Sequence, residues 1–111
     1  MAQANTCPEL SVDEVAELMA RKKAVLIDVN PRRRWASGHL PGAANLDPGE
    51  YTEADLPADK TATLVFYCSG PGSSASRYAA QKAARFGYAH VFIMPAGLRG
   101  WLAARRPAEA L

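Results

Sequence analysis

Cysteine and histidine are scarce in this chain. Its 111 residues include two cysteines, Cys7 and Cys68, and two histidines. One distant cysteine pair, with no visible secretory leader, makes a poor disulfide framework. No C-x-x-C motif or Cys/His cluster predicts a metal site. We therefore expect no bound metal, and we expect Cys7 to be incidental because it lies near the start of the chain.

Long hydrophobic runs and a strong net charge are also missing. No apolar stretch approaches the roughly 18 residues of a membrane-spanning helix. The first residues lack the basic and apolar regions of a signal peptide. The net charge of +2 is too small to indicate nucleic-acid binding. These absences predict a cytoplasmic protein whose partners are neither membranes nor nucleic acids.

The composition is that of an ordinary globular protein. With 49% hydrophobic and 22% charged residues, the chain has enough apolar side chains for one core. Its length suits a single domain. We expect a flexible start over residues 1–9, one domain over 10–107 and a short tail over 108–111.

Strand and helix patterns alternate along the chain. Strands are predicted at 24–29, just before 46, at 64–67 and at 90–94, and helices at 11–21, around 34–36, from 73 or 74 to 86, and at 98–105. Ser11 and Glu14 have the spacing of a capping box, and Leu10 and Val15 that of a hydrophobic staple. This alternation predicts an α/β domain with a mainly parallel sheet and helices on both faces. Ligands bind such sheets beyond the carboxyl ends of the strands.

Cys68 stands at one of those carboxyl ends. It follows the apolar strand 64–67 and opens a turn-rich loop that leads into a helix with a serine N-cap. Backbone N–H groups of such a loop, with the positive helix end, stabilise negative charge and lower a cysteine pKa. The sequence thus predicts a nucleophilic thiolate inside an anion-binding loop. The loop residues are Ser69, Gly70, Pro71, Gly72, Ser73 and Ser74.

Two other interpretations of this junction remain open. A cysteine after an apolar strand is often just a small buried hydrophobic residue. A glycine-rich loop between a strand and a helix can also bind a phosphate or a dinucleotide. The second alternative is weak, because the loop matches neither G-x-G-x-x-G nor G-x-x-x-x-G-K-[ST].

Several motifs occur together in a recognisable order. Asp28 and residues 38–45 (GHLPGAAN) match the pattern D…G-H-[IL]-P-G-A-x-N, and FYC at 66–68, FGY at 86–88 and AGL at 96–98 follow in family order. Over about residues 10–107 the chain closely resembles a single rhodanese-like (sulfurtransferase) domain. The resemblance implies a central five-stranded, mainly parallel sheet.

The resemblance also implies a function. Cys68 would take a sulfane sulfur from thiosulfate, a polysulfide or a protein persulfide, hold it as a persulfide, and pass it to a thiophilic acceptor such as a protein. No metal or organic cofactor is implied. Asp28 and His39 would have structural roles, with His39 tying the turn over 38–43 to neighbouring backbone.

The loop departs from the usual family pattern. Family loops often read C-x-x-G-x-[RT], and a close variant reads C-x-G-P-x-C; this chain has Ser73 at the last position and no charged loop residue. The missing charge predicts weak turnover of dianionic thiosulfate. We expect a nearby arginine to supply it, and the candidates are Arg32, Arg33, Arg34 and Arg77. Ser73 and Ser74 are expected to cap the helix, to hydrogen-bond the sulfur, or both, with capping as the preferred role.

Two further functions compete with sulfur transfer. A rhodanese-like module without catalysis would bind a protein partner or sense redox state. A phosphatase or arsenate reductase would need a loop of the form C-x-x-x-x-x-R, in which arginine clamps the oxyanion. Ser74 stands where that arginine would be, which argues against the second function.

Overall fold

A computed structural model of the chain describes residues 7–111. The first six residues, which make up most of the start predicted to be flexible, lie outside the described residues. The elements in chain order are α1 (Val12–Ala20), β1 (Val25–Asp28), α2 (Arg32–Ser37), β2 (Ala44–Asn45), the 3-10 helix η2 (Glu53–Asp55), β3 (Thr63–Tyr67), α3 (Ala75–Arg85), β4 (His90–Ile93) and α4 (Gly97–Ala103). This order confirms the predicted α/β class.

The sheet is parallel throughout and has the strand order β2-β1-β3-β4. It contains four strands instead of the expected five. At the place of a fifth strand, Glu9 forms a single parallel bridge with Ile93, flanked by N–H···O bonds of 2.8 and 3.0 Å. The pairing is short because Pro8 has no N–H to donate and Ser11 already caps α1.

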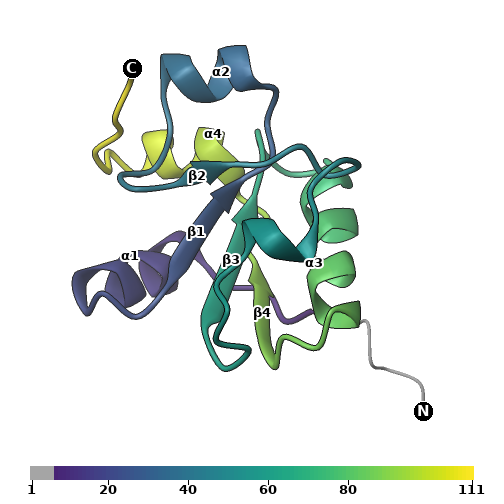
Figure 1. The fold of residues 1–111 in the computed structure, drawn as a ribbon. Helices are drawn as coiled ribbons and strands as arrows, with labels where there is room; N and C mark the ends of the chain where they lie inside the picture. Colours follow the sequence, from purple (N-terminus) through teal and green to yellow (C-terminus); the bar gives the residue numbers. More distant parts are fainter. Residues whose placement is uncertain (1–6) are drawn as a thin grey trace.

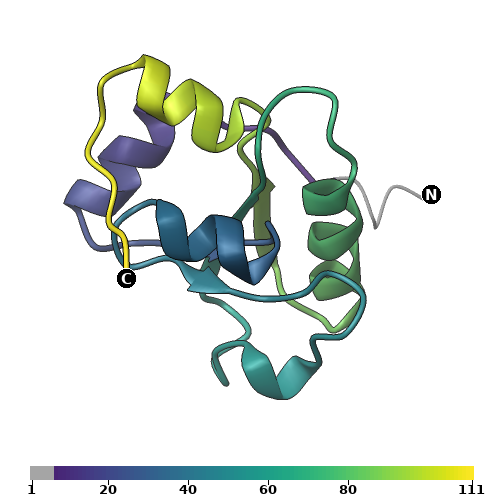
Figure 2. The same ribbon diagram turned by 90° about the horizontal axis from the view of Figure 1, so that it is seen from above.

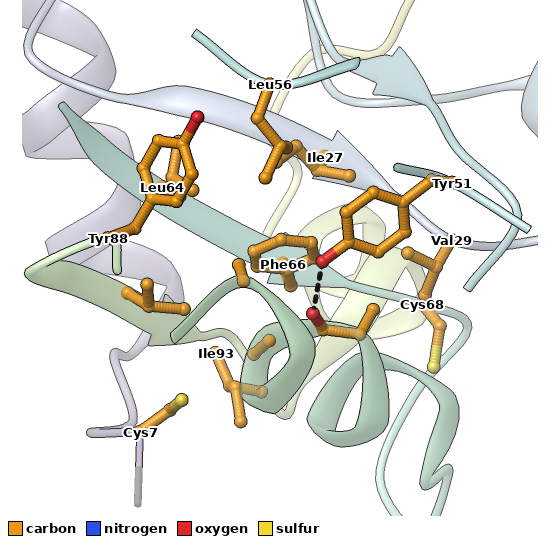
Figure 3. Close-up of a cluster of buried hydrophobic side chains, with 14 residues drawn as sticks. Cys7, Ile27, Val29, Tyr51, Leu56, Leu64, Phe66, Cys68, Tyr88 and Ile93 are labelled. Atoms are coloured by element: carbon orange, nitrogen blue, oxygen red, sulfur yellow. Dashed lines mark hydrogen bonds between the residues drawn. The ribbon is translucent and has the colours of Figure 1, made fainter. Parts of the chain in front are cut away.

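The alternating side chains of β3 divide the core into two clusters. Leu64, Phe66 and Cys68 lie on the face covered by α3, whereas Val65 and Tyr67 lie with residues of α1 and α4. Figure 1 shows α3 on one side of the sheet and α1 and α4 on the other. Because side chains of a strand alternate between faces, the Cys68 side chain points to the α3 side (Figure 3).

The capping box and the hydrophobic staple predicted for the start of α1 can both be examined in the structure. The Ser11 hydroxyl accepts from the Glu14 N–H at 3.1 Å, and the Glu14 carboxylate accepts from the Ser11 N–H at 2.8 Å. The predicted capping box is therefore confirmed. Leu10 and Val15, the predicted staple pair, belong to the same hydrophobic cluster.

Both ends of the described chain are more ordered than we expected. Cys7 is buried in the α3-side cluster, so it is a core residue and not an incidental one. At the other end, Glu109 and His39 exchange backbone hydrogen bonds of 2.8 and 2.9 Å, and the Leu111 N–H donates to the Ala36 carbonyl at 2.9 Å. Residues 7–9 and 109–111 thus belong to the folded unit.

The carboxyl ends of the strands form the edge where a ligand is expected. Seen from above in Figure 2, α2, α4 and the loop between β3 and α3 surround this edge. In the described part of the chain, no helix combines the length and apolar character that crossing a bilayer requires.

Candidate active site

Cys68 directly follows β3 and lies at the edge that α2 and α4 surround. Its side chain is 5% exposed and clusters with Val29 and Phe66. In Figure 3 the sulfur lies beside the first turns of α3. The thiol is thus shielded from bulk water, and it belongs to the residue directly before the loop.

Two hydroxyl groups lie near the sulfur. The Cys68 thiol donates to Ser73 Oγ at 2.6 Å, and Ser76 Oγ lies 4.0 Å from the sulfur. Ser74 occupies the N-cap position of α3, but its side chain makes no capping bond. Ser73 instead accepts a long bond from the Ala75 N–H at 3.4 Å. Of the two serines expected to cap the helix, the Ser74 side chain does not, whereas Ser73 Oγ both accepts the Ala75 N–H and contacts the sulfur.

The loop backbone offers unused donors. Ser73 donates its N–H to the Gly70 carbonyl at 3.4 Å. Among residues 7–111, no acceptor pairs with the N–H groups of the other non-proline loop residues, which are Ser69, Gly70, Gly72 and Ser74. Gly72 has φ of +90°, a conformation that favours glycine. Such a run of free amides is suited to an anion.

The start of α4 holds the loop in place. The N–H groups of Leu98 and Arg99 donate to the carbonyls of Cys68 and Ser69, each at 2.8 Å. Gly97 has φ of +65°, and a Cβ there would lie 2.5 Å from the Gly70 nitrogen and 2.6 Å from the Cys68 oxygen. Only glycine permits this approach, so α4 and the loop form one unit.

The four candidate arginines occupy different positions. Arg34 donates to Ser69 Oγ at 2.6 Å, and this hydroxyl donates to Asn30 Oδ1 at 2.7 Å. Among the described residues, the other three arginines make no hydrogen bond or ion pair with the loop. Arg32 lies over the Trp35 ring, Arg33 lines a cavity with Pro31, Arg34 and Ser37, and Arg77 pairs with Glu9 at 2.8 Å. Arg34 is thus the candidate that contacts the loop.

Arg99 is a further positively charged residue beside the loop, and it was not among the four arginines expected from the sequence. A Cβ on Gly70 would lie 3.5 Å from Arg99 Cζ, so the guanidinium covers the loop at Gly70. One signal was available, since Arg99 follows the turn after the last predicted strand and so belongs to the same sheet edge. Ser76 was missed as well, because no linear spacing indicates that its hydroxyl faces the sulfur.

Asp28 and His39 bind backbone and aromatic neighbours. Asp28 Oδ1 accepts the Asn30 N–H at 2.7 Å, and burial raises the pKa of this carboxyl despite opposing hydrogen bonds. Burial, reinforced by Asp28, also raises the pKa of the Tyr67 hydroxyl, which accepts the Leu40 N–H at 3.0 Å. His39 Nδ1 lies 2.6 Å from the Trp35 carbonyl, and the two rings stack.

Two cavities flank the loop at this edge. The first, of about 440 Å³, is lined in part by Asn30, Arg32 and Ala75. Asn30 Nδ2 is buried and has no hydrogen-bond partner among the described residues. The second cavity, of about 250 Å³, lies between α2 and α4, and Ser69 contributes to its wall. The arrangement combines a cysteine thiol, backbone donors suited to an anion and cavities on two sides of the loop.

The chain is similar to proteins of one family. Residues 11–104 match the sequence profile of the Rhodanese-like domain. The thiosulfate sulfurtransferase GlpE of Haemophilus influenzae is 29% identical over 101 residues, which cover 91% of this chain and 93% of that protein.

Longer proteins contain a similar segment. The adenylyltransferase and sulfurtransferase UBA4 of Candida albicans is 36% identical over 87 residues, covering 73% of this chain. The HTH-type transcriptional regulator Rv0324 of Mycobacterium tuberculosis is 38% identical over 60 residues, covering 50% of this chain. The matched segments span only 20% and 26% of these two proteins.

Solved structures share the fold. The human single-domain sulfurtransferase TSTD1 superposes with a TM-score of 0.74 at 27% identity, covering 87% of this chain and 96% of that one. The BH2092 protein of Bacillus halodurans superposes with a TM-score of 0.84 at 19% identity, covering 93% and 77%. With the profile match over residues 11–104, these likenesses show that the chain belongs to the rhodanese-like domain family.

Proposed function

We propose that this protein is a sulfurtransferase that carries sulfane sulfur on Cys68. The observation that supports the proposal most directly is the position of the Cys68 sulfur, beside the Ser73 hydroxyl and under a loop with unpaired N–H groups. These donors stabilise a sulfur anion as an oxyanion hole stabilises an oxygen anion. The likeness to GlpE, a thiosulfate sulfurtransferase, supports the same class of reaction.

The reaction has two steps. The Cys68 thiolate attacks the outer sulfur of thiosulfate; a new S–S bond forms, the S–S bond of thiosulfate breaks, and sulfite leaves with the electron pair. A thiophilic acceptor then attacks the outer sulfur of the persulfide, and the electron pair of the broken bond returns to Cys68 as a thiolate. Each step breaks one S–S bond and forms one new bond to the transferred sulfur, so no further oxidant or cofactor takes part.

Arg34 is the residue we assign to charge compensation. The loop has no charged side chain, and a thiosulfate dianion needs a counter-charge when it approaches the sulfur. The Arg34 guanidinium donates to the hydroxyl of Ser69, the residue that follows Cys68 in the chain. A protein persulfide carries one negative charge, and a polysulfide separates its two charges along a sulfur chain, so either is also a suitable donor.

Intact mass spectrometry tests the proposal. The reduced protein is incubated with excess thiosulfate or, separately, with polysulfide. We expect a gain of about 32 Da, the mass of one sulfur atom, in the wild type and in Cys7→Ala, but not in Cys68→Ser. A gain in the Cys68→Ser variant, or no gain in the wild type with either donor, would contradict the proposal.

A rhodanese-like module without catalysis is the second candidate. It is favoured by the 5% exposure of Cys68 and by the absence of charge in the loop. Such a module would bind a protein partner or sense redox state. A wild-type protein that acquires no sulfur from either donor would support this second function.

A further inference from the structure

The edge strand β4 has one well-covered face and one that is only partly covered. Val91 and Ile93 are buried on the α3 side, whereas His90 is exposed and Phe92 is half-buried. Because the side chains of a strand alternate between faces, His90 and Phe92 lie on the other side of the sheet, where α1 packs (Figure 1). Within residues 7–111, the helices on that side leave this part of β4 open to water.

A cavity of about 500 Å³ occupies the uncovered space between α1 and β4. Its apolar surface comes from Leu10, Leu18 and Phe92, each of which is half-buried. Thr63 and His90, paired at the amino ends of β3 and β4, line it as well. We call this space the α1–β4 groove. Its volume is in the range of known ligand sites.

The rest of the groove is acidic. Asp13, Glu14 and Glu17 of α1 line it, and of the described residues that line it none is lysine or arginine. Asp13 and Glu17 are one helical turn apart, so their carboxylates lie on the same face of α1. Glu14 also accepts the Ser11 N–H. The groove thus places apolar surface next to a row of negative charges.

Two of these carboxylates have partners that a ligand can replace. Asp13 pairs with Arg106 at 2.9 Å, and Glu17 pairs with Arg21 at 2.8 Å. The Asp13 and Glu17 side chains are 85% and 62% exposed, and exposed ion pairs contribute little to stability. A cation on a ligand can therefore compete for both carboxylates at low cost.

We propose that the α1–β4 groove docks a segment of a partner protein in which large apolar side chains are flanked by lysine or arginine. The apolar side chains pack on Leu18 and Phe92, and the cations contact Asp13 and Glu17. The spacing of the carboxylates along a helix favours a chain with repeated cations over a molecule with a single charge. Nucleic acids and anionic membranes do not fit, because the carboxylates repel their phosphate groups.

The groove is separate from the candidate active site. Thr63, at the groove, and Cys68 are at opposite ends of β3, so they are about 16 Å apart along the strand. A partner in the groove therefore leaves the Cys68 loop accessible. Docking does not depend on sulfur transfer, so either proposal can fail without the other.

Three short peptides separate the two features of the groove. Acetyl-KLLKKLLK-amide has both leucine and lysine, acetyl-ELLEELLE-amide has the opposite charge, and acetyl-KSSKKSSK-amide has no large apolar side chain. Each is titrated into the full chain, and the NMR signals of the Leu18 methyl groups and the Phe92 amide are followed. We expect the first peptide to shift both signals and to bind at least about tenfold more tightly than the other two. The amide signals of Gly70 and Gly72, in the Cys68 loop, should not move.

Removing carboxylates from the groove should weaken binding of the leucine–lysine peptide. For Asp13→Asn with Glu17→Gln, we expect the dissociation constant to rise by about threefold to tenfold, as for two exposed ion pairs. Glu50→Gln with Glu109→Gln is the matched control, because it removes the same charge outside the groove and should keep the wild-type constant. All four side chains are exposed, so neither double variant opens the core.

Several results would overturn the docking proposal. It fails if the Leu18 and Phe92 signals stay in place, if either of the other peptides binds as tightly as the leucine–lysine peptide, or if the Asp13 and Glu17 changes leave its dissociation constant unaltered. It also fails if the signals move when the protein concentration alone is raised, because a second copy of this chain would then occupy the groove. The persulfide on Cys68 is measured separately by intact mass.

Discussion

At the scale of single residues, one hydroxyl group determines the surroundings of the candidate nucleophile. Ser73 Oγ lies 2.6 Å from the Cys68 sulfur and also accepts from the Ala75 N–H. When the sulfur is ionised, the hydroxyl proton can turn toward it, so the contact is available to both the thiol and the thiolate. Because the Ser73 side chain contacts the Cys68 sulfur, a cysteine at position 73 would bring a second thiol next to Cys68.

The variant Ser73→Cys should form a disulfide with Cys68. The side-chain tips already touch, and a disulfide needs the two Cβ atoms about 3.5–4.5 Å apart. After treatment with oxidised glutathione, we expect a mass about 2 Da below the reduced form and loss of Cys68 alkylation. Ser73→Ala, treated in the same way, should keep an alkylatable Cys68. Full alkylation of both thiols in oxidised Ser73→Cys would show that the two positions are not in contact.

The sequence predicted part of this site because part of it is local. Cys68 and its loop are one continuous segment, and the strand pattern before it located the carboxyl end. The packing of α2 and α4 decides which arginine side chain contacts the loop. The spacing of residues along the sequence does not reveal this packing. The sequence therefore offered four arginines, of which Arg34 contacts the loop, and it missed Arg99.

At the scale of elements, the candidate loop depends on α4 as much as on its own residues. Two N–H groups from the start of α4 hold the carbonyls of Cys68 and Ser69. Gly97 permits this contact, since it combines a positive φ with a close approach to the Gly70 backbone. The helix itself was predictable from the pattern around Trp101, but its contact with the loop is visible only in the folded chain.

Gly97→Ala should displace the loop from α4. The added methyl group would overlap backbone atoms at 2.5–2.6 Å and would force alanine into a left-handed conformation. We expect the free energy of unfolding to fall by about 2–4 kcal/mol, measured in urea, and persulfide formation to slow. Gly38→Ala is the matched control, because it has nothing within 4 Å and extended backbone. Equal stability of the two variants would refute the coupling.

At the scale of the whole molecule, the two ends of the described chain pair with different parts of the domain. The segment around Glu9 pairs with β4, at the place where a fifth strand was expected. The fifth strand was inferred from the family and not from local pattern, and Pro8 explains why it is reduced to a bridge. At the other end of the chain, Glu109 pairs with His39 and Leu111 with Ala36, next to the end of α2, and no local pattern predicted these contacts.

The C-terminal contacts are important for α2 because none of the six residues of the helix is buried and its N-cap makes no side-chain bond. Glu109 pairs with the backbone of His39 just after the helix, its carboxylate accepts the Gly42 N–H at 3.0 Å, and Leu111 donates to Ala36. These bonds fix the helix that carries Arg34 to the loop.

Deletion of residues 108–111 should therefore loosen α2 selectively. Each lost hydrogen bond contributes about 1 kcal/mol, which is about fivefold in an exchange rate, and the deletion removes the bonds of Glu109 and Leu111 together. We therefore expect amide exchange in α2 and at 39–43 to accelerate by more than about tenfold. Exchange in β1 and β3 should change little, because their ladders and core contacts remain. Glu109→Gln is the control, since its side-chain oxygen still accepts from Gly42 and its backbone pairing is kept. If the deletion leaves α2 exchange at the wild-type rate, the helix is positioned by the sheet edge alone.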